Sequence, residues 1–346
     1  MNSKSVCCVG GDAAQSFAFE ALRDNGLPGS FFLGSGKAVP WTQEISAAIA
    51  GSSAVLVGLS GRSPQSDSEL AAIQEAFRLG KPVVVYEDTY GVWQRGQFQE
   101  VLGRIHSMFV IDCDEAVAVA QAFPGVKPIV VGNPTWDDYF FPDMDRKEVR
   151  QLLGVDEDRT MVLVSGVKEL TIDIPVLDDV VNALCQDYLP QQFHVVMSLH
   201  PGSAYGPEPF QGLVDYGQSD KVGVSVITRE QMPSAQALAG ADLVVSPVSS
   251  LIIGAACQRI PVICWFNSVG RGRQLAINGR TTWKPFEMGI GPVFLSGGND
   301  ILGEQITRLL DPSAFEPFRL RQEKLFPKPE GPGEPTRKMT EYLLSL

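Results

Sequence analysis

Two segments of the chain repeat the same pattern, and this repeat limits the folds that the chain can adopt. Residues 51–60 (GSSAVLVGLS) match residues 240–249 (GADLVVSPVS), and residues 76–86 (AFRLGKPVVVY) match residues 255–265 (AACQRIPVICW). Each copy reads as an apolar strand, a helix and a second apolar strand, and strands that are apolar at every position are typical of a parallel sheet covered on both faces. The repeat therefore predicts two similar α/β domains.

The same alternation of short apolar strands and helices continues through most of the chain. The predicted strands are 6–9, 30–33, 54–58, 82–86, 108–111, 128–131, 161–165, 193–199, 223–227, 242–245, 262–265 and 292–295. We therefore expect two Rossmann-like, doubly wound parallel-sheet domains that face each other across a cleft. Ligands in such sheets bind beyond the carboxyl ends of the strands.

Interruptions of this alternation predict the domain boundaries. The amino-terminal domain is expected to span 1–132, and a hinge with a linker helix to span 133–158, because Gly132-Asn133-Pro134 breaks the pattern. The carboxyl-terminal domain is expected at 159–311. Residues 312–346 are predicted to be a tail of proline-rich linkers that ends in one helix.

Charge and cysteine content favour a small-molecule partner and a cytoplasmic location. The net charge of −12 and the pI near 4.8 argue against broad binding to nucleic acid or anionic membranes, although a polymer acceptor, including modified nucleic acid, stays open. The six cysteines show no CxxC spacing, which is typical of free thiols in a reducing cytosol. No signal peptide and no membrane-spanning segment is expected. The oligomeric state does not follow from the sequence.

A serine-rich turn lies between a predicted strand (242–245) and a predicted helix (251–257). Ser246, Ser249 and Ser250 occupy this turn. Unpaired amides at the start of a helix carry partial positive charge, and serine hydroxyls add hydrogen-bond donors, so the turn suits a phosphate. Ser249 could instead only cap the helix, but a capping serine can also contact phosphate.

Three basic side chains follow other strands of the second half. His200 ends the strand 193–199 and precedes a Pro-Gly turn, where it could act as an acid, a base or a diphosphate partner. Arg271 and Arg273 lie in a glycine-containing segment after 262–265, and fit diphosphate neutralisation or, alternatively, a solvated surface loop. His106 and His194 are interpreted as structural.

Acidic residues follow strands of the first half. Glu87 and Asp88 come directly after 82–86, and could take a proton from an acceptor hydroxyl or simply cap the next segment. Asp12 follows a Gly-Gly pair; helix capping is the favoured interpretation, and a role on the acceptor side is the alternative. Glu69 has the spacing of a capping box, which explains it without a functional role.

These motifs together resemble a known group of enzymes. The LHPG sequence at 199–202, followed by ADLVVSPVSSLIIGAACQRIPVICW at 241–265, resembles the carboxyl-terminal half of GT-B enzymes of the UDP-N-acetylglucosamine 2-epimerase and CDP-glycerol glycerophosphotransferase group. Gly132-Asn133-Pro134 and Asp137 resemble the Gly-Asn-x-x-x-Asp turn of that group. Glu87-Asp88-Thr89 resembles the place where the epimerases have a His-Val-Glu-Ala-Gly motif with a catalytic glutamate. Gly254, in contrast, stands where the group usually has the glutamate that holds the nucleotide ribose.

The resemblance implies a glycosyltransferase or related transferase, and no metal is expected because Arg and Ser side chains and a helix dipole can hold the leaving charge. It would move a sugar or polyol-phosphate group from a nucleotide-diphosphate donor, such as a UDP-sugar, to an acceptor hydroxyl, with no cofactor besides the donor. Donor diphosphate binding is expected from Ser246, Ser249, Ser250, Arg271 and Arg273. Proton transfer is expected from Glu87, Asp88 and His200.

Three alternatives remain open at this point. One is a nucleotide-sugar 2-epimerase or hydrolase. Another is a non-catalytic nucleotide-sugar-binding protein, which Gly254 makes worth testing. A deoxyribosyltransferase-like domain, suggested by LGKPVVVYED, explains only one half of the chain. The base, the sugar, the acceptor and the stereochemical course do not follow from the sequence.

Overall fold

The computed structural model describes residues 4–186, 191–278, 282–295 and 299–346. The chain divides into two compact units, of which unit 1 comprises 1–137 with 330–346, and unit 2 comprises 138–329. Each unit contains one six-stranded parallel sheet with helices on both faces. In the described part of the chain, no helix is long and apolar enough to cross a membrane.

The sheet of unit 1 has the strand order β2-β1-β3-β4-β5-β6. Its strands are β1 (Val6–Gly10), β2 (Gly29–Leu33), β3 (Ala54–Val57), β4 (Val83–Tyr86), β5 (Ser107–Val110) and β6 (Lys127–Val130). Its helices are α1 (Ala13–Asp24), α2 (Gln43–Gly51), α3 (Gln65–Arg78), η1 (Val92–Gln94), η2 (Gly96–Phe98), α4 (Gln99–Leu102), α5 (Cys113–Ala122), η3 (Pro134–Trp136), α6 (Asp137–Phe140, which crosses into unit 2) and α16 (Glu334–Ser345).

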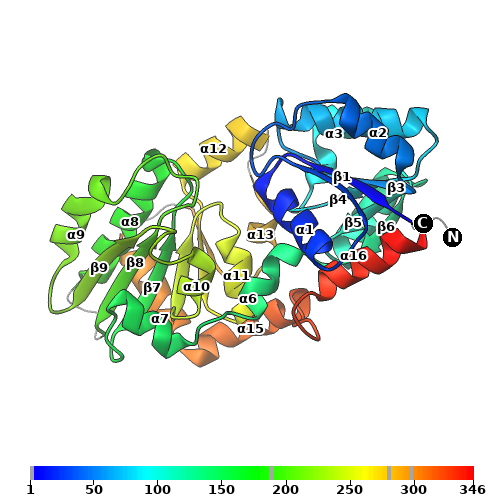
Figure 1. The fold of residues 1–346 in the computed structure, drawn as a ribbon. Helices are drawn as coiled ribbons and strands as arrows, with labels where there is room; N and C mark the ends of the chain where they lie inside the picture. Colours follow the sequence, from blue (N-terminus) through cyan, green and yellow to red (C-terminus); the bar gives the residue numbers. More distant parts are fainter. Residues whose placement is uncertain (1–3, 187–190, 279–281, 296–298) are drawn as a thin grey trace. The chain divides into compact units, whose positions relative to one another are not determined.

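Successive residues of the unit 1 strands enter two different cores, as expected for strands covered on both faces. Val57 and Val85 pack with residues of α2 and α3, whereas Leu56 and Val84 pack with residues of α1 and α16. Figure 1 shows α2 and α3 on one side of this sheet, and α1 with α16 on the other. The continuous apolar runs in the sequence therefore correspond to strands that are buried on both faces of the sheet.

The last helix, α16, belongs to the core of unit 1. Met339 and Leu343 are fully buried there, and Tyr342 packs edge-on against Phe109 of β5 with 5.6 Å between ring centroids. The sequence suggested that 312–346 is a tail, but its last helix is part of the unit 1 core. This amphipathic helix covers the part of a sheet face that α1 leaves open.

The sheet of unit 2 has the order β12-β11-β10-β7-β8-β9, which in chain order is the 3-2-1-4-5-6 arrangement of a Rossmann domain. Its strands are β7 (Thr160–Ser165), β8 (Phe193–Ser198), β9 (Val222–Ile227), β10 (Leu243–Ser246), β11 (Val262–Trp265) and β12 (Val293–Phe294). Its helices are α7 (Arg146–Leu153), α8 (Leu170–Leu184), η4 (Glu208–Phe210), α9 (Gln211–Gly217), α10 (Ser234–Leu238), α11 (Leu251–Gln258), α12 (Ser268–Asn278), α13 (Lys284–Glu287), α14 (Asn299–Leu309) and α15 (Pro312–Leu325).

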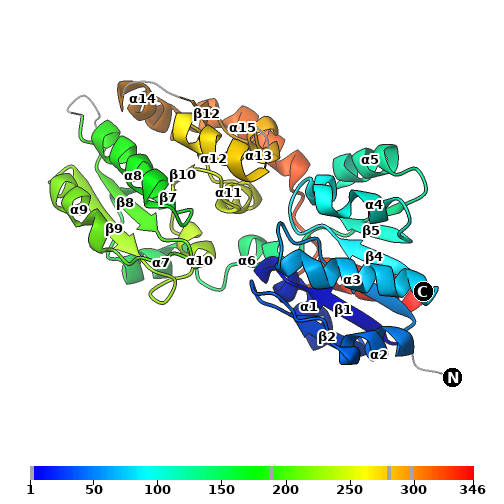
Figure 2. The ribbon, with the colours of Figure 1, turned by 90° about the horizontal axis from the view of Figure 1, so that it is seen from above.

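Helices also cover both faces of this second sheet. Side chains of α8 and α14 share one core with Val162, Val164 and Ile263, and the indole nitrogen of Trp265 donates to Asp179 Oδ2 of α8 at 2.8 Å. Helix α11 contacts α10 and α15, away from this core (Figure 2). The loops that follow β7, β8, β10 and β11 gather at the carboxyl edge of the sheet.

Helix α15 corrects the prediction of a proline-rich linker after residue 311. Pro312 occupies the first turn, where a missing N–H costs nothing, and the Asp311 side chain accepts from Ser313 N at 2.8 Å. Gln322 of this helix donates to the carbonyls of Ile260 and Ile290, at 3.2 and 2.9 Å. These long-range bonds fix α15 on unit 2.

Candidate functional site

The carboxyl edge of each sheet has one topological switch point, where chain connections leave in opposite directions. It lies between β1 and β3 in unit 1, and between β7 and β10 in unit 2. The repeat found in the sequence corresponds to β3-α3-β4 and β10-α11-β11, so its first strand borders the switch point in both units. Ligand contacts are therefore expected at the ends of β1, β3, β7 and β10.

Two serines meet at the switch point of unit 2. Ser165 Oγ at the end of β7 lies 2.5 Å from Ser246 Oγ at the end of β10, and Ser246 is fully buried. The pair ties the two strands together underneath the serine-rich turn. Ser246 thus supports the turn, and its hydroxyl is already engaged within the protein.

Ser249 and Ser250 occupy the start of α11, as predicted. Ser250 is the N-cap residue of α11, and Ser249 Oγ, one residue earlier, accepts from Leu251 N at 3.3 Å, so Ser249 pairs with the first amide of the helix. Ser250 is exposed and its hydroxyl lies 3.4 Å from the Tyr139 hydroxyl. The turn therefore presents an exposed hydroxyl beside a second one, which the sequence did not indicate.

Tyr139 also explains the glycine at position 254. A Cβ atom on Gly254 would lie 2.8 Å from two ring carbons of Tyr139 and 2.9 Å from Leu238 Cδ2. The aromatic ring fills the space that a larger side chain would need. Burial raises the pKa of Tyr139 above 10, so its hydroxyl remains protonated and able to donate.

His200 follows β8 and lies beside a lysine that the sequence reasoning did not select. Its Nδ1 accepts from Gly202 N at 2.9 Å, which in the neutral ring places the proton on Nε2. A Cβ atom built on Gly202 would be 3.3 Å from Lys168 Nζ and 3.5 Å from His200 Nδ1. Lys168 is exposed and follows β7, so both side chains belong to the same edge of the sheet.

Arg271 lies on a helix instead of a flexible loop. The Asn267 side chain accepts from Val269 N at 3.0 Å and from Gly270 N at 3.2 Å, which starts α12 despite its two glycines. Arg271 is exposed on this helix. The side chain of Arg273 is outside the described part of the structure.

In unit 1, Glu87 is fully buried and pairs with a second carboxyl group. Its Oε1 accepts from Gly91 N at 3.0 Å and its Oε2 from Ile111 N at 3.2 Å. Burial raises the pKa of Glu87 well above 4.5, and the neighbouring charge of Glu115 and a hydrogen bond to it raise the pKa further. Glu115 also accepts from the Trp93 indole at 2.8 Å. The shift makes Glu87 easier to protonate than a free glutamate, and its two backbone hydrogen bonds hold the loop after β4.

Replacing Glu87 with glutamine should leave the fold intact and change its pH dependence. The folded-state pKa is raised, so the stability linked to Glu87 is fully present below about pH 4.5 and is lost as the pH rises through that raised value. Gly91 N also donates to Glu115 Oε2 at 3.3 Å, so it keeps an acceptor when the glutamine amide faces it. In urea unfolding, Glu87→Gln should therefore differ from wild type by less than about 1 kcal/mol at pH 6 and should lose less stability as the pH rises. The exposed Glu100→Gln is the control, and an unchanged pH dependence in Glu87→Gln would contradict the pairing.

Asp88 differs from its neighbour because its Oδ1 atom is buried without a hydrogen-bond partner in the described residues. Its backbone carbonyl accepts from Asn133 Nδ2 at 2.8 Å, and Asn133 Oδ1 accepts from the Tyr86 hydroxyl at 2.9 Å. The Gly-Asn turn thus fixes the end of β4. Burial raises the pKa of Asp88 from 3.8 to about 6, while the positive charge of Arg95 lowers it and the negative charge of Asp12 raises it.

Asp12 and Arg95 converge on the loop that follows β3. Asp12 precedes α1, and its Oδ2 accepts from Gly61 N at 3.3 Å. Arg95 Nη1 donates to the Leu59 carbonyl. Asp12, Asp88 and Arg95 therefore form one charged cluster at the carboxyl edge of unit 1, which we call the unit 1 acid cluster.

Glu69 does not form the capping box that its spacing suggested. Helix α3 begins after Pro64, and the fully buried Glu69 side chain instead reaches the loops after β1 and β3, where it accepts from Gly11 N and Ser60 N. Its partner residues are 58 and 9 positions away in sequence. The capping interpretation is wrong because these tertiary bonds position the side chain.

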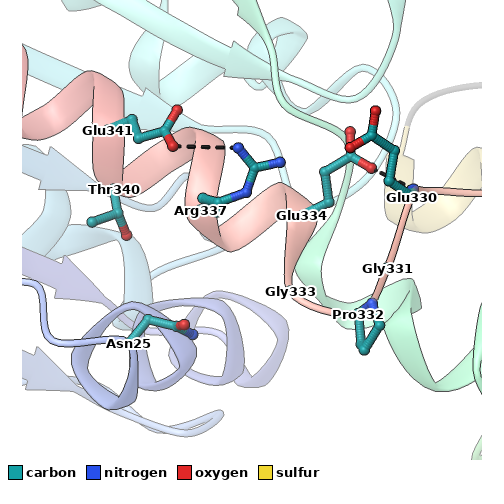
Figure 3. Close-up of a pocket in the computed structure, with 9 residues that line it drawn as sticks. All are labelled: Asn25, Glu330, Gly331, Pro332, Gly333, Glu334, Arg337, Thr340 and Glu341. Atoms are coloured by element: carbon teal, nitrogen blue, oxygen red, sulfur yellow. Dashed lines mark hydrogen bonds and ion pairs between the residues drawn. The ribbon is translucent and has the colours of Figure 1, made fainter.

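A surface cavity of about 400 Å³ in unit 1 contains none of the predicted site residues (Figure 3). Its lining groups contact one another: Arg337 pairs with Glu341 at 3.3 Å, and Glu334 Oε2 accepts from the backbone N–H of Glu330 at 2.8 Å. The cavity is therefore not a candidate for the site predicted at the carboxyl edges of the sheets.

Metal ligands and disulfides do not contribute to the described part of either unit. No group of three or more His, Cys, Asp or Glu side chains in the described ranges could hold a metal ion. All six cysteines are free thiols, and Cys113 is exposed at the start of α5.

Sequence comparisons find no relative, whereas structural comparisons find many. No family model and no curated protein matches the chain. A UDP-GlcNAc 2-epimerase from Neisseria meningitidis, solved bound to UDP-GlcNAc, is 16% identical with a TM-score of 0.63, covering 99% of this chain and 100% of that chain. A glycosyltransferase from Rickettsia africae is 10% identical with a TM-score of 0.60, covering 100% and 99%.

A third similar structure is the wall teichoic acid polymerase TagF, which was soaked with CDPG. It is 10% identical with a TM-score of 0.57, and the match covers 100% of this chain and 89% of that chain. The chain therefore has the GT-B fold, built from two Rossmann-like α/β domains. These structural matches confirm the predicted fold class, and the structures that share the fold include UDP-GlcNAc 2-epimerases and TagF. The cleft between the domains and the roles of the site residues stay predictions.

Proposed function

We propose that the chain is an enzyme that transfers a sugar or polyol-phosphate group from a nucleotide-diphosphate donor to an acceptor hydroxyl. The observation that carries this proposal is the carboxyl edge of the Rossmann sheet in unit 2. There, loops after three strands present the exposed Ser250, the imidazole of His200 and the ammonium group of Lys168. Hydroxyl, imidazole and ammonium donors at such an edge match the charge of a diphosphate.

Each unit has a separate chemical task in this proposal. Ser249, Ser250, Arg271 and His200 of unit 2 bind the donor diphosphate, and Ser246 supports them from beneath. Asp88 of unit 1 accepts the proton of the acceptor hydroxyl, whose oxygen forms the new bond to the transferred group. In sugar transfer the nucleoside diphosphate leaves, and in polyol-phosphate transfer the nucleoside monophosphate leaves. In both cases the leaving group takes the electron pair of the broken bond. Basic side chains and the start of α11 offset its charge, so we propose that no metal or further cofactor takes part.

The ligand class is tested directly by thermal unfolding with UDP, CDP, GDP and dTDP conjugates. A ligand present at 100 times its Kd stabilises a protein by about 2.7 kcal/mol, which gives a clear rise in Tm. The matching sugar or glycerol conjugate is then tested for turnover with and without acceptor. If no conjugate raises Tm, the proposed function is wrong.

Replacing His200 with alanine should lower donor turnover about 10- to 100-fold, because a hydrogen bond to a charged group is lost. The neutral ring donates from Nε2, since Nδ1 is occupied by Gly202 N. The effect should therefore appear in the KM for the donor as well as in kcat. His106→Ala is the matched control because His106 is exposed on unit 1. Wild-type turnover of His200→Ala would remove His200 from the site.

A 2-epimerase or hydrolase is the second candidate, favoured by the unit 1 acid cluster. Such reactions need more than one acid near the sugar, and Asp12 is close enough to Asp88 to raise its pKa. NMR of a UDP-sugar incubated without acceptor separates the candidates. An epimerised or free sugar supports this second activity, whereas a donor that reacts only after an acceptor is added supports transfer. Stabilisation by the conjugate without any turnover would indicate a nucleotide-sugar-binding protein.

A further inference from the structure

Glu69 is a buried acid that the proposed chemistry does not use. It lies in α3 and is fully buried, yet its side chain reaches two loops at the switch point of unit 1. Glu69 Oε1 accepts from Gly11 N at 2.8 Å and from Ser60 Oγ at 2.6 Å, and Oε2 accepts from Ser60 N at 2.6 Å. One carboxylate therefore joins the loop after β1 to the loop after β3.

The next residue of each loop is joined to its counterpart as well. Asp12 follows Gly11, Gly61 follows Ser60, and Asp12 Oδ2 accepts from Gly61 N at 3.3 Å. Asp12 N donates to Gln15 Oε1 at 3.2 Å. Hydrogen bonds therefore join the two loops at two consecutive positions, one through Glu69 and one through Asp12.

An ionised carboxylate, the form that Glu69 takes above about pH 7, satisfies all three of the donors from Gly11 and Ser60. Both of its oxygens accept hydrogen bonds, whereas an amide of the same shape would turn an N–H group toward one of the donors. The loops also approach closely, since a Cβ atom on Gly11 would be 2.9 Å from Ser60 Oγ. Burial raises the pKa of Glu69 from 4.5 to about 7, and the nearby charge of Asp12 adds to this. Burying the charge of Glu69 lowers the stability of the fold. An apolar residue that only filled the space would not have this cost.

We propose that Glu69 is a positioning residue that holds the loops after β1 and β3 together and thereby fixes the carboxylate of Asp12. This inference rests on the proposed function where it concerns turnover, because Asp12 belongs to the unit 1 acid cluster. The same loop is held from its other side, where Gln97 Nε2 donates to the Ser60 carbonyl at 3.0 Å. Glu69 does not itself touch a reacting group.

The structural part is tested by NMR on protein labelled with ¹⁵N-glycine and ¹⁵N-serine. In Glu69→Gln, the amide hydrogens of Gly11, Ser60 and Gly61 should exchange at least about tenfold faster than in wild type, which corresponds to about 1.4 kcal/mol. Glu75→Gln is the matched control, because Glu75 lies on the same helix and pairs with Arg78 and Ser46. Unchanged exchange in Glu69→Gln would overturn the proposal, and Glu69→Asp serves if the glutamine variant does not fold.

The link to Asp12 is tested by a double-mutant cycle on turnover. Glu69→Gln should lower turnover in the wild-type background and have no further effect in Asp12→Asn. A purely structural residue would lower turnover equally in both backgrounds, and that result would overturn the link. If wild type turns over no donor, the proposed function fails, while the amide exchange still decides whether Glu69 holds the loops.

Discussion

Replacing Asp88 with asparagine is expected to lower kcat about 10²- to 10⁴-fold, the range that a positioned general base contributes. Three observations single out this acid. Its Oδ1 atom has no hydrogen-bond partner in the described residues, its backbone is fixed by Asn133, and its pKa is raised to about 6. A base of this pKa is ionised at neutral pH and still binds a proton strongly enough to help remove it from a hydroxyl.

The pH profile provides the sharper measurement. Below about pH 6 the raised pKa keeps Asp88 protonated, so log kcat/KM should rise with a slope of one up to that pH and then level off. Asp88→Asn should lose this acidic limb together with the rate. The exposed Asp67→Asn is a control that leaves both unchanged. Wild-type turnover of Asp88→Asn would place the base elsewhere.

The neighbouring Glu87 gives an internal contrast. Glu87→Gln should retain turnover at neutral pH, because both carboxyl oxygens of Glu87 accept backbone hydrogen bonds, from Gly91 N and Ile111 N, and so hold a loop instead of facing an acceptor. The sequence offered Glu87 and Asp88 as equivalent candidates for the base. Opposite results for the two variants would support the assignment to Asp88.

Replacing Gly254 with glutamate is expected to lower the free energy of unfolding by about 3 kcal/mol, since overpacking and burial of a charge both contribute. Gly254 is buried, and its Cβ position lies 2.8 Å from the Tyr139 ring. Urea unfolding followed by circular dichroism measures the change. Gly272→Ala is the control, because no atom lies within 4 Å of a Cβ atom built on Gly272 and the added methyl group has space.

A second substitution tests whether the tyrosine ring causes this effect. Tyr139→Ala removes the ring, so Gly254→Glu should cost at least about 1 kcal/mol less in that background than in wild type. Equal costs in both backgrounds would contradict the explanation. We therefore interpret Gly254 and Tyr139 together. The Tyr139 ring from α6 occupies the space that the glutamate expected from the resemblance would fill.

The strands and the fold class could be predicted because their signal is local. Four consecutive buried apolar residues, as in β3 or β11, report a strand covered on both faces wherever they occur. Helices α12 and α15 were missed for the opposite reason. Glycine and proline in their sequences indicate loops, whereas the Asn267 side chain and the bonds of Gln322 stabilise helices there.

The same distinction between local and long-range signals applies to the residues of the candidate site. The sequence located the serine-rich turn, His200 and Asp88, because polar residues that follow an apolar strand lie at the carboxyl edge of a parallel sheet. It could not select Lys168 or Tyr139, whose significance depends on neighbours from other loops. It also misassigned Glu69, whose spacing matches a local capping pattern.

The sequence by itself determined two doubly wound domains and the edge of each sheet where polar residues gather, because strand periodicity and chain direction are encoded locally. Only the tertiary structure decided which acids are paired and which is open to accept a proton. It also decided why residue 254 is a glycine and what Glu69 holds. The physical reason is that pKa, packing space and hydrogen-bond satisfaction depend on groups far apart in the chain, such as Gly11 and Glu69, which only folding brings together.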